Sequence, residues 1–226
     1  MAGAWQILVG RPDMVLDWTL AHLQMVTIAC AIAIVLALPL GVYITGGGRR
    51  REAFADTVLY LAEITMTVPS LALFGLIMVI LSGLNLPSLG FPPAIIALVI
   101  YAQLPILRNT YTAIRGVEPA IIEAGKGMGM SERQLLFRIK LPLAFPVIMA
   151  GLRTAVIATI AIAAIAALVG SGGLGVPIRW GLRNARMDLI IVGAATVSII
   201  GILFDVLMHR VERWVTPEGL KRRAKA

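Results

Sequence analysis

The sequence predicts an all-α integral membrane protein with about five transmembrane helices, and three observations support this. Hydrophobic residues make up 59% of the 226 residues and charged residues only 14%, which is outside the usual range of soluble domains. Five apolar segments are each long enough to cross a bilayer. The basic residues lie mainly between these segments, as they do in loops that remain on one side of a membrane.

The length of each apolar segment predicts whether it can span the membrane. A helix needs roughly 20 apolar residues to cross about 30 Å of hydrocarbon at about 1.5 Å per residue. The segments that meet this length are residues 22–44, 57–82, 92–114, 147–169 and 188–208. The first is too long for a secretory signal, and Asp13 and Asp17 replace the expected basic residues, so we expect a retained span. The predicted domains are an extracytoplasmic segment (1–21), a transmembrane domain (22–209) and a basic cytoplasmic tail (210–226).

The distribution of charge predicts the orientation. Most of the 20 basic residues fall in three regions, near residues 49–51, 108–140 and 210–225. Five spans place all three regions on one side, so the amino terminus is expected outside and the carboxyl terminus inside. Arg179, Arg183 and Arg186 fall in a connection that this topology places outside, and they count against it.

The net charge of +8 does not indicate nucleic-acid binding, because no basic stripe with interleaved aromatic residues is present. The single cysteine, Cys30, lies in an apolar run and is expected to be a small core residue.

The long connection at about 115–142 has a helical pattern of its own. Pro119 suits a first helical turn, Gly127 and Gly129 can end that helix, and Ser131 can cap a second one. We therefore expect two short helices between the third and fourth spans.

This loop carries the most specific motif in the chain. The sequence Glu123-Ala124-Gly125 is followed after three residues by Gly129, and after nine more by Ile139-Lys140-Leu141-Pro142. The spacing resembles the E-A-A loop of ABC importer permeases, with Gly125 in place of the second alanine. In that family the loop docks into the ATPase subunit, which implies docking by Glu123, Ala124 and Gly125. The alternative is an ordinary pair of interfacial helices.

Further segments resemble the permeases of osmoprotectant importers, namely residues 67–70, 104–110, 127–130, 172–175 and 216–220. The resemblance implies the type I importer permease fold, in a multi-pass protein of the bacterial cytoplasmic (inner) membrane. It also implies transport of an osmoprotectant such as glycine betaine or choline. Methionine or another small polar solute is the alternative substrate within the superfamily.

The sequence contains no G-x-x-x-x-G-K-[S/T] phosphate loop, so we expect no cofactor in this chain. The resemblance implies that ATP and Mg²⁺ bind a separate ABC ATPase dimer. The other implied partners are a second permease chain, identical or homologous, and an extracytoplasmic substrate-binding protein.

Two other classes of membrane protein are alternatives to an importer permease. A membrane enzyme is disfavoured because His22 and His209 fall at opposite membrane faces and no nucleophile and base can be paired, so we do not expect an enzyme. An ion-coupled secondary transporter or channel suits the interrupting prolines Pro39, Pro69 and Pro105.

Polar residues inside the spans are candidates for a translocation path. Glu63 and Arg153 both fall in the cytoplasmic half of the bilayer in this topology, where an unpaired charge costs roughly 2.5–3.5 kcal/mol. They are expected either to pair with each other or to face water separately, and Asp205 competes for Arg153. Thr67, Pro69 and Ser70 form a polar, kink-prone stretch that either lines the path or packs between helices.

Overall fold

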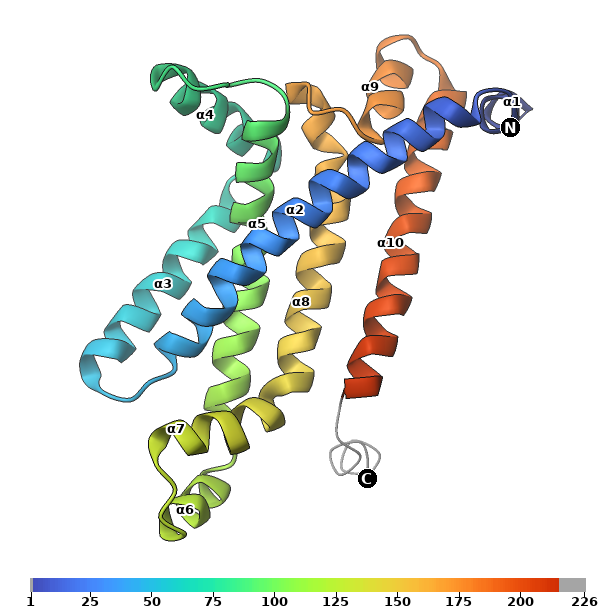
Figure 1. Cartoon of the computed structure of the whole chain (residues 1–226). Helices are drawn as coiled ribbons and strands as arrows, with labels where there is room; N and C mark the ends of the chain where they lie inside the picture. Colours follow the sequence, from blue (N-terminus) through green and yellow to red (C-terminus); the bar gives the residue numbers. More distant parts are fainter. Residues whose placement is uncertain (1, 216–226) are drawn as a thin grey trace.

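The structure is a computed structural model, and it describes residues 2–215 (Figure 1). In chain order its elements are α1 (Ala2–Gly10), α2 (Pro12–Ile44), α3 (Arg49–Thr67), α4 (Ser70–Gly83), α5 (Phe91–Arg115), α6 (Pro119–Gly127), α7 (Glu132–Leu135), the π-helical segment η1 (Leu136–Lys140), α8 (Leu141–Ala163), the 3₁₀ segment η2 (Ile165–Val169), α9 (Gly175–Arg183) and α10 (Met187–Val215). Within these residues all regular secondary structure is helical, as the sequence predicts.

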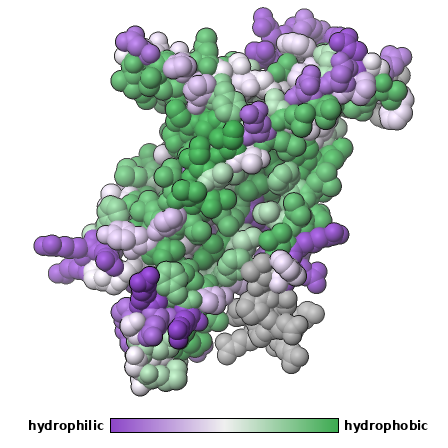
Figure 2. All heavy atoms as spheres, viewed as in Figure 1, coloured by the Kyte–Doolittle hydropathy of each residue, from purple (hydrophilic) through white to green (hydrophobic). Residues whose placement is uncertain are grey.

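Four helical stretches are long and apolar enough to span a membrane: α2, α5, the stretch 132–163 that contains α8, and α10. The bent pair α3–α4 makes a fifth if it counts as one span. Apolar side chains cover the surface between two polar ends (Figure 2). Among them, Val35 is 70% exposed and Val79 is 71% exposed, and such a surface is stable in lipid rather than in water.

The second predicted span, residues 57–82, is divided by a sharp bend at its polar, kink-prone stretch. Helices α3 and α4 meet at an angle of 105°. Pro69 has no N–H to continue the hydrogen-bond ladder, and Val68 before it takes an extended conformation (φ −73°, ψ 124°). The Tyr101 hydroxyl on α5 donates a hydrogen bond to the Val68 carbonyl that the break leaves free.

Helix α5 occupies the centre of the bundle and packs against both α2 and α8 (Figure 1). Glycines permit both close approaches. A β-carbon at Gly41 of α2 would lie 2.9 Å from the Thr110 side chain, and one at Gly151 of α8 would lie 2.5 Å from the Asn109 Cβ. Small residues are the usual means of bringing membrane helices together, because lipid supplies no hydrophobic force between them.

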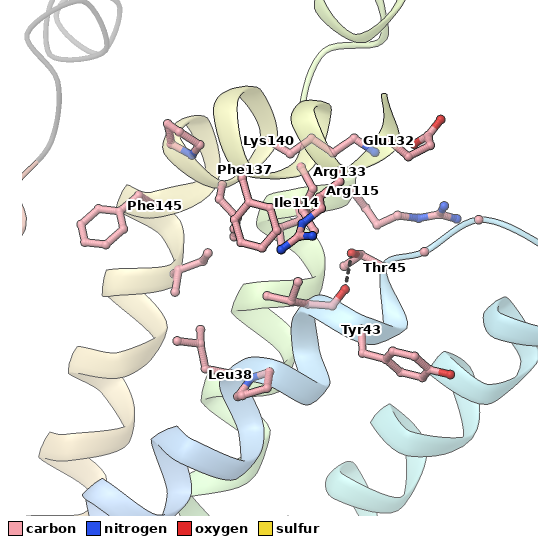
Figure 3. Close-up of a pocket in the computed structure, with 18 of the residues that line it drawn as sticks. Leu38, Tyr43, Thr45, Ile114, Arg115, Glu132, Arg133, Phe137, Lys140 and Phe145 are labelled. Atoms are coloured by element: carbon pink, nitrogen blue, oxygen red, sulfur yellow. Dashed lines mark hydrogen bonds between the residues drawn. The ribbon is translucent and has the colours of Figure 1, made fainter. Parts of the chain in front are cut away.

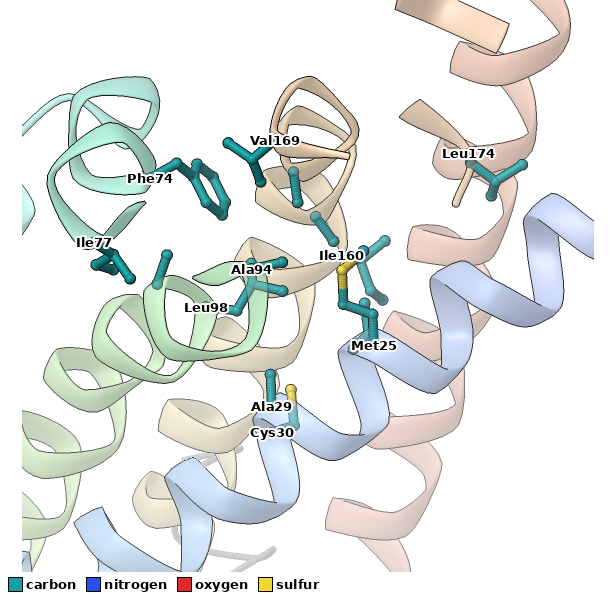
Figure 4. Close-up of a cluster of buried hydrophobic side chains, with 14 of the residues drawn as sticks. Met25, Ala29, Cys30, Phe74, Ile77, Ala94, Leu98, Ile160, Val169 and Leu174 are labelled. Carbon is teal, nitrogen blue, oxygen red and sulfur yellow. The ribbon is translucent and has the colours of Figure 1, made fainter. Parts of the chain in front are cut away.

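The main core cluster lies toward the end of the bundle where α4 and α9 are found (Figure 4). Met25 of α2, Phe74 of α4, Leu98 of α5 and Ile160 of α8 are almost completely buried there. Cys30 is buried in the same cluster, as expected. With Ile200 of α10, this core joins five helices and fixes the bent α4 against the bundle.

The first span begins ten residues before the expected boundary, since α2 starts at Pro12 and is preceded by α1. Most of the segment 1–21 is therefore helical, and α1 packs against α10. At this end Arg186 donates to Asp188 (Nη2–Oδ2, 2.6 Å), and this hydrogen bond raises the pKa of the Arg186 guanidinium. One of the three arginines that count against the predicted orientation is thus paired with a carboxylate. Most of the predicted tail, from residue 216, lies outside the described residues.

Candidate coupling loop and buried polar residues

Helix α6 ends in a tight left-handed turn at Gly129. The Met130 N–H donates to the Gly125 carbonyl (3.1 Å), and the Gly129 N–H donates to the Lys126 carbonyl (2.9 Å). Gly129 has φ +79°, a conformation that residues with a β-carbon rarely adopt. These features make a Schellman motif, so Gly129 ends the helix as predicted. Gly127 is the last residue of α6 and has no positive φ.

Helix α7 begins at the predicted cap. The Ser131 hydroxyl accepts a hydrogen bond from the Gln134 N–H (3.3 Å), and the Ser131 N–H donates to Gln134 Oε1 (2.8 Å). This reciprocal pair is a capping box. An ion pair between Lys126 Nζ and Glu132 Oε1 (3.3 Å) also joins α6 to α7. The turn between α6 and α7 is therefore held by the hydrogen bonds that end α6, by the capping box that begins α7 and by an ion pair between the two helices.

From α7 the chain continues into the fourth span without a break. Residues 132–163 form one helical stretch that contains α7, η1 and α8. The Leu141 N–H donates to the Leu136 carbonyl, five residues earlier, so this turn is π-helical. Pro142 follows at the start of α8, where an α-helical turn would press the Arg138 carbonyl against the proline ring. The wider turn accommodates Pro142 and connects the loop to the span through continuous helix.

The two ends of the motif pack against each other. Gly125 is buried, and a β-carbon there would lie 2.6 Å from Leu135 Cδ2 and 3.0 Å from Ile139 Cδ1. Leu135 is completely buried. The glycine that departs from the E-A-A pattern therefore lets α6 lie directly on the α7–η1 segment.

The opposite face of α6 is exposed. Glu123, Ala124 and Gly127 are exposed, and Met128 is 75% exposed. Glu123 forms no ion pair within residues 2–215. The loop thus presents a surface of small residues, one carboxylate and one flexible apolar side chain at its tip.

The structure corrects the expected pairing of Glu63 with Arg153. Glu63 on α3 accepts from Arg108 on α5 (Oε1–Nη1, 2.7 Å), and Arg153 on α8 forms a two-point contact with Asp205 on α10. Asp205, the alternative partner expected for Arg153, is therefore the residue with which it pairs. The sequence carries one signal for the partner of Glu63: Arg108 lies within the expected span 92–114, where a basic side chain needs a carboxylate.

The polar stretch at the α3–α4 break satisfies its own backbone. The Thr67 hydroxyl donates to the Ile64 carbonyl (2.7 Å), and Thr65 donates likewise to Ala62 (2.6 Å). Pro69 forms the break, and Ser70 is the first residue of α4. Thr67 and Pro69 are exposed and Ser70 is half-buried, so both roles of this stretch, lining the path and packing between helices, stay predictions.

Comparison with known proteins identifies the family. The profile of the family described as "Binding-protein-dependent transport system inner membrane component" matches residues 19–217. Curated relatives include the osmoprotectant import permease protein OsmW of Salmonella typhimurium, 39% identical over 90% of this chain and 92% of the relative. The choline transport system permease protein OpuBB of Bacillus subtilis is 41% identical over 90% of this chain and 89% of the relative.

Solved structures show the same fold. An inward-facing form of the MetNI methionine ABC transporter has a chain that superposes with a TM-score of 0.80, at 23% identity, over 92% of this chain and 99% of that chain. A chain of an amino acid ABC transporter crystallised with histidines superposes with a TM-score of 0.77, at 19% identity, over 91% and 96%. The chain therefore belongs to the binding-protein-dependent transport system inner membrane component family and is the membrane-spanning permease subunit of an ABC importer.

Proposed function

We propose that this permease conducts an osmoprotectant, such as glycine betaine or choline, across the bacterial inner membrane. The observation that carries the substrate class is the identity of 39–42% over about nine-tenths of the chain to permeases named for osmoprotectants, choline, glycine betaine and carnitine. The likeness to a methionine transporter, at 23% identity, supports the fold alone. Few aromatic residues lie within the spans, so selectivity is expected to come mainly from a separate binding protein.

The proposed mechanism uses the coupling loop as a rigid lever. Glu123 and Ala124, on the exposed face of α6, dock in a groove of the ATPase, with Glu123 meeting a basic group. Gly125, which the resemblance also implies as a docking residue, is instead buried against the α7–η1 segment. Movement of α6 passes to Leu135 and Ile139 through the close contact at Gly125. From there it reaches α8 through η1, Leu141 and Pro142, because residues 132–163 form continuous helix. Gly129 keeps α6 and α7 at a fixed angle.

The partners of this mechanism are an ABC ATPase dimer that binds ATP and Mg²⁺, a binding protein outside the membrane, and a second permease chain, identical or homologous. Exposed apolar residues of α3, α4 and α10, including Leu61, Leu76 and Leu203, supply surface for the second permease chain or for lipid. The coupling loop lies inside the cell in the proposed orientation.

Uptake by the reconstituted system tests the substrate. The permease, its ATPase and its binding protein are placed in proteoliposomes, and ATP-driven accumulation of radiolabelled glycine betaine, choline, carnitine and methionine is compared. We expect uptake of at least one of the first three and none of methionine. Uptake of methionine alone would overturn the proposed substrate class. Uptake by the permease alone, driven by an ion gradient, would overturn the ATP-driven mechanism.

A further inference from the structure

A groove of about 1470 Å³ opens beside the coupling loop, at the end of the bundle where α2 and α5 finish and α8 begins (Figure 3). Its apolar wall comes from three different membrane-spanning helices and includes Leu38, Val42, Ile114, Ile148 and Leu152. Leu38 and Leu152 lie two to three turns inside their helices. The groove therefore extends from the polar end of the molecule into the apolar region between the helices.

The rim of this groove is strongly basic. Arg51, Arg115, Lys126, Arg133 and Lys140 line it, with Glu132 as its one carboxylate. Two of the five cations have carboxylate partners, since Arg115 pairs with Glu52 (2.9 Å) and Lys126 with Glu132 (3.3 Å). Among residues 2–215, no carboxylate forms an ion pair with Arg51, Arg133 or Lys140. Three cations at the mouth of the groove thus have no anionic partner in this part of the chain.

Aromatic residues and one glycine hold two of these cations in place. The Arg51 guanidinium lies 5.1 Å from the centre of the Tyr43 ring, and that of Arg133 lies 5.9 Å from the Phe137 ring. A β-carbon at Gly46 would lie 2.2 Å from Arg51 Nη1, so Arg51 rests directly on the backbone at Gly46. Stacking on rings keeps an arginine charged and ordered while its donors remain available.

We propose that this groove binds one anionic phospholipid. The headgroup phosphate meets Arg51, Arg133 and Lys140, and an acyl chain lies along Leu38, Val42 and Leu152. A soluble anion would leave the apolar wall uncovered, and a neutral lipid would leave the three cations without a partner. A bilayer provides both parts of this ligand at the ends of the spans. Only the assignment to the inner leaflet rests on the proposed orientation.

The site also joins the lipid to the coupling loop. Lys126, Arg133 and Lys140 belong to α6, α7 and η1, whereas Arg51 belongs to α3 and the apolar wall to the spans. A bound phospholipid would bridge the loop and the bundle at the point where the proposed lever meets the membrane.

Lipid retention by the full-length permease tests the proposal. The protein is purified from membranes that contain phosphatidylglycerol and phosphatidylcholine, and tightly bound lipid is measured by native mass spectrometry. The test variant is Arg51→Gln/Lys140→Gln. The matched control is Arg49→Gln/Arg50→Gln, which removes the same charge at the same end of α3 but outside the groove. A basic residue near a membrane contributes about fivefold to anionic-lipid binding, so the test variant should bind phosphatidylglycerol roughly 30-fold more weakly.

Three further measurements make the outcome decisive. Gly46→Ala, which displaces Arg51 without removing its charge, should weaken retention by several fold, and soluble glycerol phosphate should not displace the lipid. Leu152→Trp, which places a large side chain in the apolar part of the groove, should also reduce retention.

Equal loss in the Arg49→Gln/Arg50→Gln control, or equal retention of phosphatidylcholine, would overturn the proposed lipid site. So would release of the lipid on assembly with the ATPase, because an ATPase segment would then be the occupant. None of these measurements depends on transport, so the lipid proposal can be tested even if the proposed substrate class is wrong.

Discussion

Gly125 and Leu135 lie so close together that a β-carbon on the glycine would come within 2.6 Å of Leu135 Cδ2. Leu135 is completely buried, so its side chain has little room to move away. The contact holds α6 on the helical segment that leads into α8, and it depends on the absence of a side chain at position 125. The properties of the loop can be tested through this contact and its neighbours.

Gly125→Ala should loosen the coupling loop. Alanine favours helix by roughly 0.5–1 kcal/mol, but the overlap with Leu135 and Ile139 is an overpacking of about 1–3 kcal/mol, so we expect a net loss. Hydrogen–deuterium exchange in residues 119–135 should be faster. Adding Leu135→Val, which removes the overlapping methyl group, should restore protection, and failure of this rescue would show that the contact is not the cause.

Gly129→Val should disrupt the turn between α6 and α7. A β-branched residue at φ +79° costs about 1–2 kcal/mol or more, and the Schellman hydrogen bonds depend on that conformation. The variant should insert into the membrane but lose substrate-stimulated ATPase activity in the assembled complex. Gly83→Val, at the exposed end of α4, is the matched control, because a β-carbon there meets no atom within 4 Å and φ is not positive. Full coupled transport by Gly129→Val would contradict the proposed lever.

Glu123→Lys should prevent docking of the ATPase. The side chain is exposed and has no ion-pair partner in residues 2–215, so reversing its charge leaves the permease fold unchanged. A basic group opposite it in the ATPase would face a like charge. Co-purification of the ATPase with tagged permease should fall sharply. Asp56→Lys, the same reversal at an exposed site on α3, should co-purify normally.

Arg153 and Asp205 should be coupled in stability. Arg153 contacts both carboxylate oxygens of Asp205, at 2.5 and 2.9 Å, between α8 and α10. Arg153→Leu should lower the thermal unfolding midpoint in detergent, because it leaves a carboxylate within a span without its partner. Adding Asp205→Leu should recover most of that loss. Two independent, additive losses would show that the pair is not energetically linked.

Cysteine labelling in whole cells should reveal the orientation. In a Cys30→Ser background, a cysteine at Gly47 should react only after the membrane is permeabilised, and one at Ser88 should react with an impermeant reagent from outside. Gly47 suits the test because a β-carbon there would meet no atom within 4 Å. Its φ is not positive, unlike that of the adjacent Gly48. The reverse pattern would invert the proposed topology.

Local chemistry explains what could be predicted at the coupling loop. Pro119, Gly129 and Ser131 occupy the positions where proline, glycine and serine satisfy helix ends, and each has the predicted role. The meeting of Gly125 with Leu135 and Ile139 could not be predicted, because it depends on the angle between two helices. The function of Gly125 as a contact surface became clear only once that angle was known.

The sequence by itself determined the apolar spans, the helix pair between the third and fourth spans, and the motif that places the chain among importer permeases. Each is encoded by composition or spacing within one segment. Only the tertiary structure decided the 105° orientation of α4, the partners of Glu63 and Arg153, and the union of Arg51, Arg133 and Lys140 at one groove. The ion pairs and the groove join residues that are distant in the sequence, and the size of the bend at Pro69 depends on what α4 packs against. Contacts between helices, such as those that Gly41 and Gly151 permit, are specified by two segments together and by neither alone.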